Sequence, residues 1–583
     1  MVRISLGVIV SMTHLTNNPE VFMEEMLEGF CELYPQYVRA VSGGVVRSTE
    51  SKTGKVAVVV GGGSGHYPAF CGVVGPGFAD GAVVGNIFTS PSAQDAYNVG
   101  KAAEHGGGIL FITGNYAGDV LNFNQAQSRL ISEGYQVKNF YVTDDVASAT
   151  VEEITKRRGI AGDFAIFKIA SAAAEEGLSL GEVEKITLRA NHFTRTLGVA
   201  FTGCTLPGAP SPLFQVPIGK MGLGLGIHGE PGISEDDMPS AHELAEILVA
   251  GTLKEFQSNP IRKIAVVLNG LGATKYEELF VTWRSVSKLL LERGYEVIEP
   301  EVGELVTSLD MAGCSPTIML LDKTLERLWK SSCDTPSYKK GEATTKSFRK
   351  QHVDINNKKE DLQLRSSQES HQLAVGVLAI LKNVYSTICS AEEELGRIDA
   401  VAGDGDHGRG MVKGLRAAVD AANEVVSSNG GLSTLFIQAG NAWAAKAGGT
   451  SGVLWGNALT AAGQCLSDDN FSISAQEILD AVSSGISSIQ TLGKAELGDK
   501  TMLDAMLPFV NELEIGLRNE KPVLVAWGQA TKVANISALA TSALSPKIGR
   551  ARPLAERSVG TPDAGAVSFG LIVKAVYEYA SKN

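Results

Sequence analysis

The sequence lacks the cysteine patterns that mark zinc sites, disulfide scaffolds and redox motifs. Its seven cysteines are an odd number and are scattered along 583 residues. No two of them form a C-x-x-C pair, which excludes the common zinc-ligand and thioredoxin-like spacings. We expect free thiols and a reducing, cytoplasmic environment.

Positive charge and long apolar runs are also scarce. The chain has 51 Lys and Arg against 64 Asp and Glu, which gives a formal net charge of −13. Such a chain repels nucleic-acid phosphates and anionic lipids, so neither nucleic acid nor a membrane is expected as a partner. No apolar run approaches the ~18 residues of a membrane span, and the run from Leu6 to Val10 is too short for the apolar part of a signal peptide. Residues 1–14 are therefore expected to be a leader without a targeting role.

Glycine, in contrast, is abundant. The 65 glycines cluster in short blocks that each follow an apolar run, as loops at the ends of strands do. The hydrophobic content of 44% is that of a globular chain, and the length corresponds to about three or four domains. Functional residues are therefore expected in the glycine-rich loops.

The pattern of apolar residues divides the chain into parts. Residues 15–334 alternate β-branched runs, such as 56–60 and 264–268, with helical stretches, which predicts an α/β half built from two subdomains. Residues 335–372 contain few large apolar side chains and predict a linker. In residues 373–583 strand patterns nearly vanish, and successive amphipathic stretches predict an all-α bundle or barrel.

Three carboxylates in the second half predict a metal site. Asp399, Asp404 and Asp406 lie close together in the sequence, and the glycines between them allow the chain to turn so that all three reach one point. Carboxylate oxygens without cysteines favour Mg²⁺ or Ca²⁺ over zinc, and the Glu that closes an EF-hand loop is missing. The alternative is an acidic turn that caps the following helix.

Further loops in this half favour a nucleotide bound through Mg²⁺. The segment 447–452 offers glycine N–H groups and hydroxyls at the start of an apolar helix, although it lacks the Lys of a Walker A motif. Cationic, hydroxyl and acidic groups follow in the segments 497–504, 549–552 and 561–565. Together with the three aspartates, these loops predict a Mg²⁺–nucleotide site in a helical domain.

Three glycine-rich segments of the α/β half are candidates for binding a small molecule. Residues 58–68 predict a strand followed by a glycine-rich loop, but the G-x-G-x-x-G spacing of a dinucleotide site is not met. Asp119 follows another predicted strand and is placed to act as a base. His228 is surrounded by glycines within residues 222–232. A lone histidine is usually structural, but so much glycine predicts that a ligand approaches closely.

Several of these segments resemble the dihydroxyacetone kinase family. The segments that resemble the substrate-binding half of that family are GGGSGH at 61–66, NIFTSPS at 86–92, NYAGDVLNF at 115–123, TDDVA at 143–147, GIHGEPGI at 226–233, LGAT at 271–274 and TSLDMAG at 307–313. The segments that resemble the family's nucleotide-binding half are GDGDHG at 403–408, GGTSG at 448–452 and GDKTMLD at 498–504. Because both halves stand in one chain, the sequence resembles the ATP-dependent branch of the family and not the branch fed by a phosphotransferase system.

The resemblance implies roles for residues of the first half. It implies that His228 bonds covalently to the carbonyl carbon of a short-chain ketose as a hemiaminal, which anchors the substrate. It implies that Asp119 deprotonates the terminal hydroxyl and that His66 assists proton transfer. The expected substrate contacts are Gly63, Ser64, Gly65 and Gly114.

The resemblance also implies an ATP site in the second half. Asp399, Asp404 and Asp406 would hold two Mg²⁺ ions that bridge the ATP phosphates. The expected nucleotide contacts are His407, Gly449, Thr450, Ser451, Lys500, Thr501, Met502, Arg550 and Asp563. The family also implies a homodimer.

Two positions depart from the family pattern. Tyr67 stands where the family usually has Glu, and Gly114 stands where it usually has Lys. Both positions neighbour expected substrate contacts, and glycine in place of lysine removes a charge and opens volume. The departures favour a four-carbon ketose such as erythrulose as a substrate beside dihydroxyacetone.

Two alternative functions stay open at the level of sequence. One is a non-catalytic ketose-binding module that regulates a partner, against which the retained Asp119 and the three aspartates argue. The other is a manganese-dependent lyase that cyclises a dinucleotide, a side activity of some fused members of the family.

Overall fold

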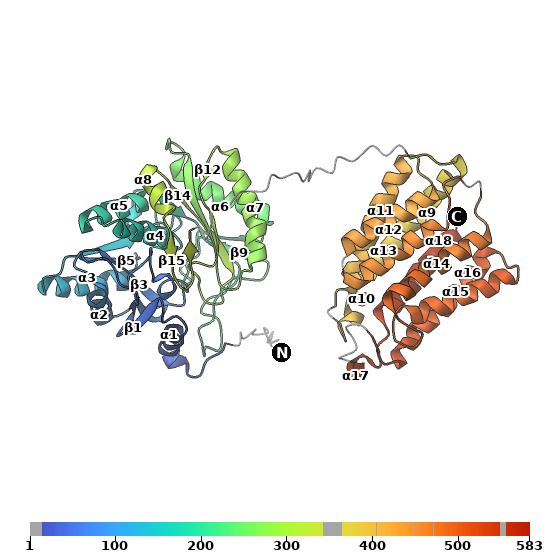
Figure 1. The fold of residues 1–583 in the computed structure, drawn as a ribbon, viewed down its shortest axis with the longest axis horizontal. Helices are drawn as coiled ribbons and strands as arrows, with labels where there is room; N and C mark the ends of the chain where they lie inside the picture. Colours follow the sequence, from blue (N-terminus) through green and yellow to red (C-terminus); the bar gives the residue numbers. More distant parts are fainter. Residues whose placement is uncertain are drawn as a thin grey trace, which may run out of the picture. The chain divides into compact units, whose positions relative to one another are not determined.

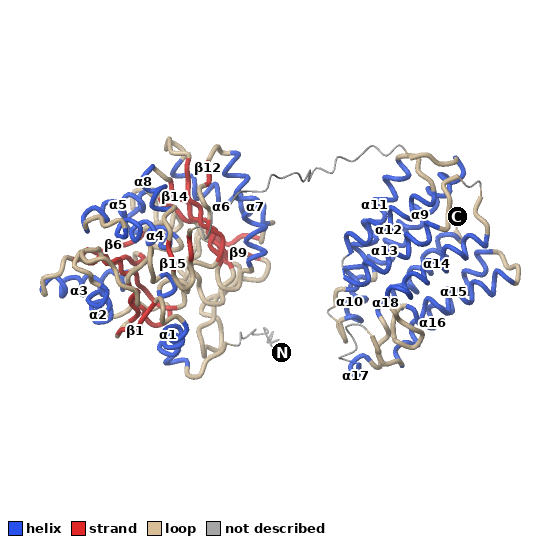
Figure 2. Tube along the Cα trace, in the orientation of Figure 1, coloured by secondary structure: helices blue, strands red, loops and turns tan. Residues whose placement is uncertain are grey.

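The protein folds as two compact units, Met1–Phe348 and Arg349–Asn583. The computed structural model describes residues 14–341, 364–403, 405–447, 449–469, 472–548 and 555–582. The first unit combines strands and helices, whereas the elements described in the second are all helices (Figure 1, Figure 2). The prediction of an α/β half followed by an all-α half is therefore confirmed.

The first sheet has six strands in the order β1-β2-β4-β3-β5-β6. Its strands are β1 (Val38–Val41), β2 (Gly44–Arg47), β3 (Ala57–Ser64), β4 (Gly81–Ile87), β5 (Ile109–Gly114) and β6 (Val137–Val142). Neighbours among β3 to β6 run parallel, and β1 and β2 extend the sheet antiparallel. The carboxyl ends of β3 and β5 therefore lie at the same edge, where ligand sites of parallel sheets form.

Helices cover both faces of this sheet. Val58 and Val60 face a core that includes α4 (Gly162–Glu175), whereas Val59 faces α2 (Ala93–Ala103) and α3 (Ala117–Ser132). Because both faces of the sheet are buried, residues 57–60 of β3 are all apolar and do not alternate with polar ones. The other helices of this region are α1 (Phe22–Leu33) and α5 (Leu180–His192).

The second sheet completes the first unit. It has eight strands, six of them in the order β10-β9-β8-β14-β11-β12, with β7 beside β14 and β13 beside β11. Its strands are β7 (Thr194–Thr196), β8 (Val199–Ala200), β9 (Lys220–Leu223), β10 (Ser234–Asp237), β11 (Lys263–Gly270), β12 (Glu296–Val297), β13 (Glu301–Gly303) and β14 (Gly313–Leu320). The helices that follow its strands are α6 (Ala241–Leu253), α7 (Tyr276–Glu292) and α8 (Lys323–Trp329). The loop between β9 and β10 carries the glycine-rich segment around His228.

The second unit consists of helices that pack against their neighbours in sequence. They are α9 (Gln368–Ser390), α10 (Glu392–Asp399), α11 (His407–Ser427), α12 (Leu432–Ala447), α13 (Gly449–Gln464), α14 (Ala475–Gly493), α15 (Leu503–Arg518), α16 (Val523–Ala540), α17 (Ala555–Ser558) and α18 (Ala564–Ala580). The last long helix, α18, returns to pack against α9 and α16. The shared core contains Trp443, Trp455, Phe509 and Phe569.

The linker is shorter than the sequence predicts. The hairpin of β15 (Cys333–Asp334) and β16 (Lys339–Lys340) belongs to the first unit, and Thr335 and Tyr338 within it are buried. At the other end, α9 already begins at Gln368. Composition alone places residues 335–340 in the linker, because most residues of the hairpin are polar and the burial of Thr335 and Tyr338 depends on tertiary packing.

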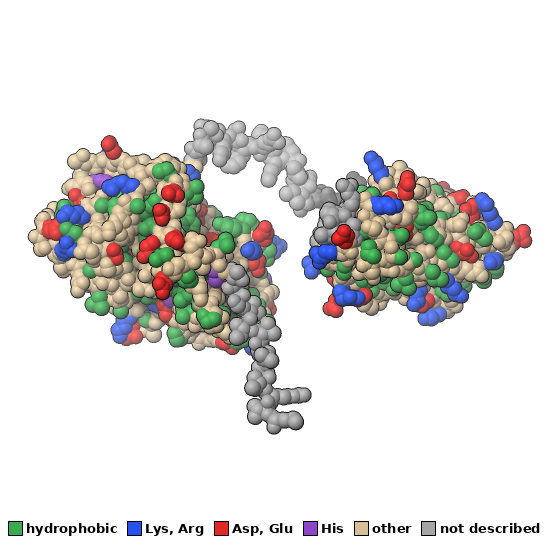
Figure 3. Space-filling view, turned by 90° about the horizontal axis from the view of Figure 1, so that it is seen from below, with side chains coloured by type: hydrophobic (Ala, Val, Ile, Leu, Met, Phe, Trp, Pro, Cys, Tyr) green, Lys and Arg blue, Asp and Glu red, His purple; other side chains and the backbone are tan. Residues whose placement is uncertain are grey.

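The described residues include one helix that is long and apolar enough to cross a membrane, by length and composition. It is α9, with a mean hydropathy of 1.5 over its most apolar part, although the sequence pattern suggested no run of that length. Its Ala374, Leu378, Val384 and Ile388 are buried in the structure. All seven cysteines are free thiols, as expected. On the face seen in Figure 3, Lys and Arg side chains of the described residues lie among acidic ones and form no continuous basic surface.

Candidate active site

The first cluster of predicted site residues assembles where strands of both sheets end. His66 follows β3, Asp119 lies in the first turn of α3 after β5, and His228 lies in the loop between β9 and β10. His66 and His228 are far apart in the sequence, yet their Nε2 atoms are 3.0 Å apart. The structure thus brings together the two histidines that the resemblance implied.

A chain of hydrogen bonds orients both imidazole rings. His66 Nδ1 lies 2.8 Å from the carbonyl oxygen of Thr307 and donates to it, so His66 Nε2 is left as an acceptor. Burial, reinforced by the nearby charge of His228, lowers the pKa of His66 to about 3, so this ring is neutral. The proton in the contact between the two Nε2 atoms therefore resides on His228.

Glu230 fixes the other side of His228. Its Oε1 accepts from His228 Nδ1 at 2.9 Å, and its Oε2 accepts from the backbone N–H of the same residue at 3.0 Å. Burial by itself raises the pKa of Glu230, but the hydrogen bond and the charge of His228 outweigh it and bring the pKa to about 2. A carboxylate is therefore held against Nδ1, which leaves Nε2 as the reactive nitrogen of the ring.

Arg158 supports this carboxylate and was not singled out from the sequence. Its Nη1 lies 3.8 Å from Glu230 Oε2, and its Nε donates to Asp145 Oδ2 at 2.9 Å. A Cβ on Gly226 would lie 2.6 Å from Arg158 Nη1, so the glycine-rich loop closes directly over this pair. No local pattern marks Arg158, because its partners come from distant segments.

Asp119 has the environment of a base. Burial raises the pKa of its carboxyl to about 6, although a hydrogen bond with Ser90 and the charge of His228 oppose the shift. Among the described residues, Asp119 Oδ1 and Ser64 Oγ are buried without a hydrogen-bond partner. Buried polar atoms are normally paired, so these two point to a hydroxylated ligand that pairs them.

Glycines at the end of β3 and directly after it allow the backbone to lie close to neighbouring segments. A Cβ on Gly63 would lie 2.6 Å from the backbone nitrogen of Thr89, and Gly65 has a φ of +98°, which side chains rarely adopt. Gly114 ends β5 beside these loops. The four predicted substrate contacts, Gly63, Ser64, Gly65 and Gly114, therefore lie on β3, β5 and the loop after β3.

The two departures from the family pattern have different surroundings in the structure, and the expectation of open volume at Gly114 is wrong. The ring of Tyr67 packs near Phe30, with a centroid distance of 6.1 Å, and its hydroxyl hydrogen-bonds Ser337, so this side chain turns toward α1 and the 337 turn. At Gly114 the space is not open, because a Cβ there would lie 2.8 Å from Cε2 of Tyr116. The neighbouring aromatic ring fills it.

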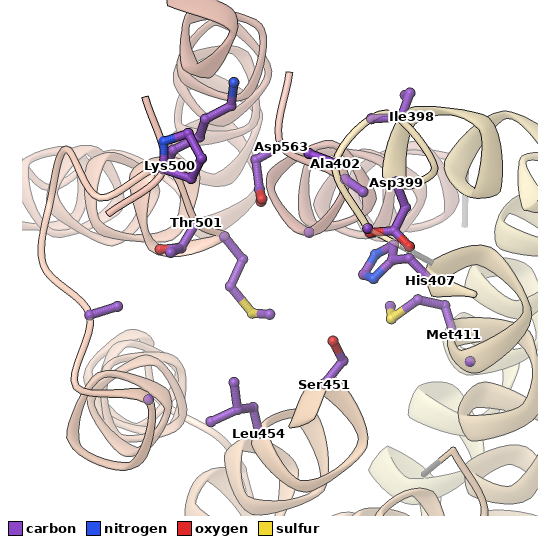
Figure 4. Close-up of a pocket in the computed structure, with 18 of the residues that line it drawn as sticks. Ile398, Asp399, Ala402, His407, Met411, Ser451, Leu454, Lys500, Thr501 and Asp563 are labelled. Carbon is purple, nitrogen blue, oxygen red and sulfur yellow. The ribbon is translucent and has the colours of Figure 1, made fainter. Parts of the chain in front are cut away.

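The second cluster lines a cavity of about 380 Å³ in the helical unit. Its walls include the side chains of Asp399, His407, Ser451, Thr501 and Asp563, which project toward the cavity from separate helices and loops (Figure 4). Met502 and Asp406 also line it. Most of the predicted nucleotide contacts are therefore gathered around one space.

The carboxylates of this cavity fit a divalent cation. Asp399 Oδ2 is buried and has no hydrogen-bond partner among the described residues. Asp406 stands at the N-cap of α11, yet its side chain makes no capping hydrogen bond, which argues against the alternative of a merely capping turn. Asp404 lies outside the described residues, and within the described ones no three His, Cys, Asp or Glu side chains form a metal-binding group. Two hard oxygen donors facing a cavity suit Mg²⁺.

His407 and Asp563 are held in place by α18. His407 Nε2 lies 3.0 Å from Ser568 Oγ, which itself donates to the carbonyl oxygen of Gly565, so the imidazole donates and its Nδ1 is free to accept. Burial lowers the pKa of His407, although the charges of Asp399 and Asp406 oppose this. Asp563 caps α18 by accepting from Ala566 N at 2.7 Å, and burial raises its pKa to about 6.

The remaining predicted nucleotide contacts either have other partners or lie partly outside the described residues. The ammonium group of Lys500 donates to the carbonyl oxygens of Leu544 and Ser558, at 3.1 and 2.6 Å. It therefore braces two loops, and its nitrogen lies away from the centre of the cavity (Figure 4). Gly449 begins α13. The side chain of Thr450 and the whole of Arg550 lie outside what the structure describes.

Comparisons with known proteins match both units. The Dak1 domain family matches residues 28–337 and the DAK2 domain family matches residues 401–578.

A D-erythrulose kinase of Mycolicibacterium smegmatis is 57% identical over 579 residues, which cover 97% of this chain and 98% of that protein. An L-erythrulose kinase of Pectobacterium atrosepticum is 50% identical and covers 97% of this chain and 96% of its own. The crystal structure of the C. freundii dihydroxyacetone kinase in complex with AMP-PNP and Mg²⁺ is similar with a TM-score of 0.58 at 28% identity, covering 98% of this chain and 100% of its own. With both domains in one chain, this protein belongs to the dihydroxyacetone kinase family.

Proposed function

We propose that this chain phosphorylates the terminal hydroxyl of a short-chain ketose with ATP and prefers erythrulose to dihydroxyacetone. As a member of its family, with relatives named as kinases along almost its whole length, it is a carbohydrate kinase. The observation that carries the proposal is the hydrogen-bonded series Thr307–His66–His228–Glu230 together with the buried carboxyl of Asp119, one oxygen of which has no partner among the described residues.

In the first step His228 anchors the ketose. His228 first gives its Nε2 proton to His66 Nε2. The Nε2 lone pair that this frees forms a bond to the carbonyl carbon, the C=O double bond opens, and His66 passes the proton on to the former carbonyl oxygen. The low pKa of His66 suits this role, because the ring accepts the proton only in passing. The product is a hemiaminal whose imidazole ring is cationic, and the adjacent Glu230 carboxylate stabilises that charge.

In the second step Asp119 prepares the terminal hydroxyl. Its raised pKa of about 6 allows the carboxylate to take the hydroxyl proton at neutral pH. Ser64 Oγ, also buried and unpartnered among the described residues, is placed to hold another hydroxyl of the ketose. The alkoxide oxygen then forms a bond to the terminal phosphorus of ATP, and the bond from that phosphorus to the bridging oxygen breaks, which releases ADP.

The helical unit supplies the phosphoryl donor. Bound there with Mg²⁺, ATP provides the phosphoryl group and the metal neutralises the charge that develops during transfer. Asp399 and Asp406, together with Asp404, are the residues that would hold the metal, in our proposal as two ions. We further propose a cytoplasmic homodimer as the working form.

The proposal is tested by coupled ADP release with four substrates and by native mass spectrometry. The substrates are D-erythrulose, L-erythrulose, dihydroxyacetone and glyceraldehyde. A hemiaminal retains every atom of the ketose, so the expected mass increase equals the whole ketose, without loss of water. His228→Ala is expected to remove the adduct and to lower kcat/KM for each ketone by at least about 100-fold, because covalent anchoring holds the substrate in one orientation.

His242→Ala is the matched control, because His242 is exposed on α6. It is expected to keep both the adduct and the activity. No adduct in the native chain would contradict the hemiaminal, and no ADP release with any of the four substrates would contradict the kinase.

The Glu230 carboxylate gives a separate prediction. Glu230→Gln keeps the shape of the side chain but removes the charge that faces His228. A hydrogen bond to a charged group contributes about 1.5–3 kcal/mol, so the equilibrium constant of adduct formation is expected to fall by about 10- to 150-fold. Titration of the adduct by native mass spectrometry measures it. Adduct formation at the native ketose concentration would show that this carboxylate does not stabilise the hemiaminal.

The alternative function is a non-catalytic ketose-binding module. Such a module needs the His228 anchor but has no use for a base with a raised pKa. Nor does it need, in the cavity of the helical unit, an aspartate oxygen that has no partner among the described residues. The combination of Asp119 and Asp399 therefore supports the kinase.

A further inference from the structure

Two aromatic rings bound the space beside His228. The ring of Tyr116 meets the imidazole edge-on, with a centroid distance of 4.9 Å and an interplanar angle of 82°. Phe88 approaches from another side at 5.1 Å and 75°, while it also stacks on His66 at 5.0 Å. Both rings contact the imidazole to which the ketose would bond, so their positions affect the size of ketose that the site accepts.

The Tyr116 ring occupies a slot beside Gly114, the space that a side chain at position 114 would enter. A Cβ on Gly114 would lie 2.8 and 3.0 Å from Cε2 and Cδ2 of this ring. A Cβ on Gly159 would lie 2.6 Å from the Cα of Gly114, so the two backbones touch. The Tyr116 hydroxyl donates to the carbonyl oxygen of Gly159 at 3.0 Å and anchors the ring there. Neither glycine has a backbone conformation that requires glycine, so the reason for their small size is this packing.

We propose that Gly114 sets the size of the ketose that the site accepts, by letting the Tyr116 ring withdraw from His228 into this slot. A single β-carbon at position 114 occupies the edge of the slot. The ring then shifts toward the imidazole that it already contacts, and the width left for carbons beyond the hemiaminal carbon falls. Tyr116 is thus a specificity-determining residue, and Gly114 acts through it. This inference rests on the proposed function, since it concerns the same site.

The charge and the volume of a side chain at 114 can be separated experimentally. Gly114→Ala adds one methyl group and no charge. We expect kcat/KM for erythrulose to fall relative to that for dihydroxyacetone by about 10- to 200-fold, the range for one small group in a tight pocket. Gly181→Ala on α5 is the matched control, because a Cβ there meets nothing within 4 Å, and it is expected to leave the ratio unchanged.

A double-mutant cycle tests whether Gly114→Ala changes the substrate ratio by displacing the Tyr116 ring. In a Tyr116→Ala background no ring remains to be displaced, so Gly114→Ala is expected to change the substrate ratio by less than about twofold. Tyr116→Ala alone is expected to raise kcat/KM for a five-carbon ketose relative to erythrulose by at least tenfold, because it removes one wall. If Gly114→Ala does not fold, Tyr116→Ala by itself tests whether the ring limits the size of the ketose. Native mass spectrometry of the dihydroxyacetone adduct shows which variants retain the site.

The outcomes distinguish this inference from the proposed function. An unchanged ratio in a folded Gly114→Ala enzyme, or an equal change in the Tyr116→Ala background, overturns the inference while ketose kinase activity persists. An unchanged preference for four carbons in Tyr116→Ala also overturns it. If the native chain phosphorylates no ketose, the proposed function itself is wrong.

Discussion

Asp119→Asn is expected to lower kcat for ketose phosphorylation by about 10²- to 10⁴-fold, the usual contribution of a general base. Asparagine has the same shape but cannot take a proton. The His228 adduct is expected to persist, because the anchoring step uses His66 and Glu230 and not Asp119. Coupled ADP release measures the first effect, and native mass spectrometry measures the second.

The pH dependence identifies the same group. The pKa of Asp119 is raised to about 6 by burial, so its carboxylate form, the active form of a base, grows as pH rises through 6. The kcat/KM of the native enzyme for dihydroxyacetone is therefore expected to rise on an acid limb near pH 6 and to level off above it. Asp119→Asn is expected to lose this limb.

Asp237→Asn provides the control for Asp119, because the same chemical change is made on the exposed strand β10. It is expected to retain the native rate and the native pH profile. A rate in Asp119→Asn close to that of the native enzyme, or an acid limb that stays in place, would show that another group accepts the proton.

Asp399→Asn is expected to abolish the Mg²⁺-dependent part of ATP binding. Its Oδ2 is buried and unpartnered among the described residues, so it offers a full ligand position to a cation. Loss of a supporting residue around a bound metal typically costs about 10- to 100-fold in affinity, and loss of a ligand is expected to cost at least that much. The same result is expected for Asp404→Asn.

Calorimetric titration with ATP, in the presence and absence of Mg²⁺, measures this effect. The ketose adduct on His228 is expected to remain, because His228 belongs to the other compact unit. Asp480→Asn, an exposed position on α14, is the matched control. Native Mg²⁺-dependent affinity in Asp399→Asn would remove Asp399 from the metal site.

The sequence predicted the elements that depend on local pattern. The apolar run 56–60 followed by GGGSGH predicts a strand and then a glycine loop; the structure confirms the strand as β3, which continues through the three glycines and ends at Ser64. The helical stretches after residue 373 correspond to α9 to α18, because amphipathic periodicity is a property of each segment alone. Family motifs around His228, Asp119 and Asp399 also stood in the sequence itself.

Tertiary structure decided which atoms these residues present to one another. The sequence predicts Lys500 as a nucleotide contact, yet its ammonium group donates to two carbonyl oxygens of the protein. Tyr67 follows His66 in sequence, but its side chain turns toward Ser337. Arg158 and Tyr116 join the site only through Glu230 and the two glycines 114 and 159. Composition and spacing record residue types along the chain, whereas side-chain direction and contact depend on the packing of segments that are distant in sequence.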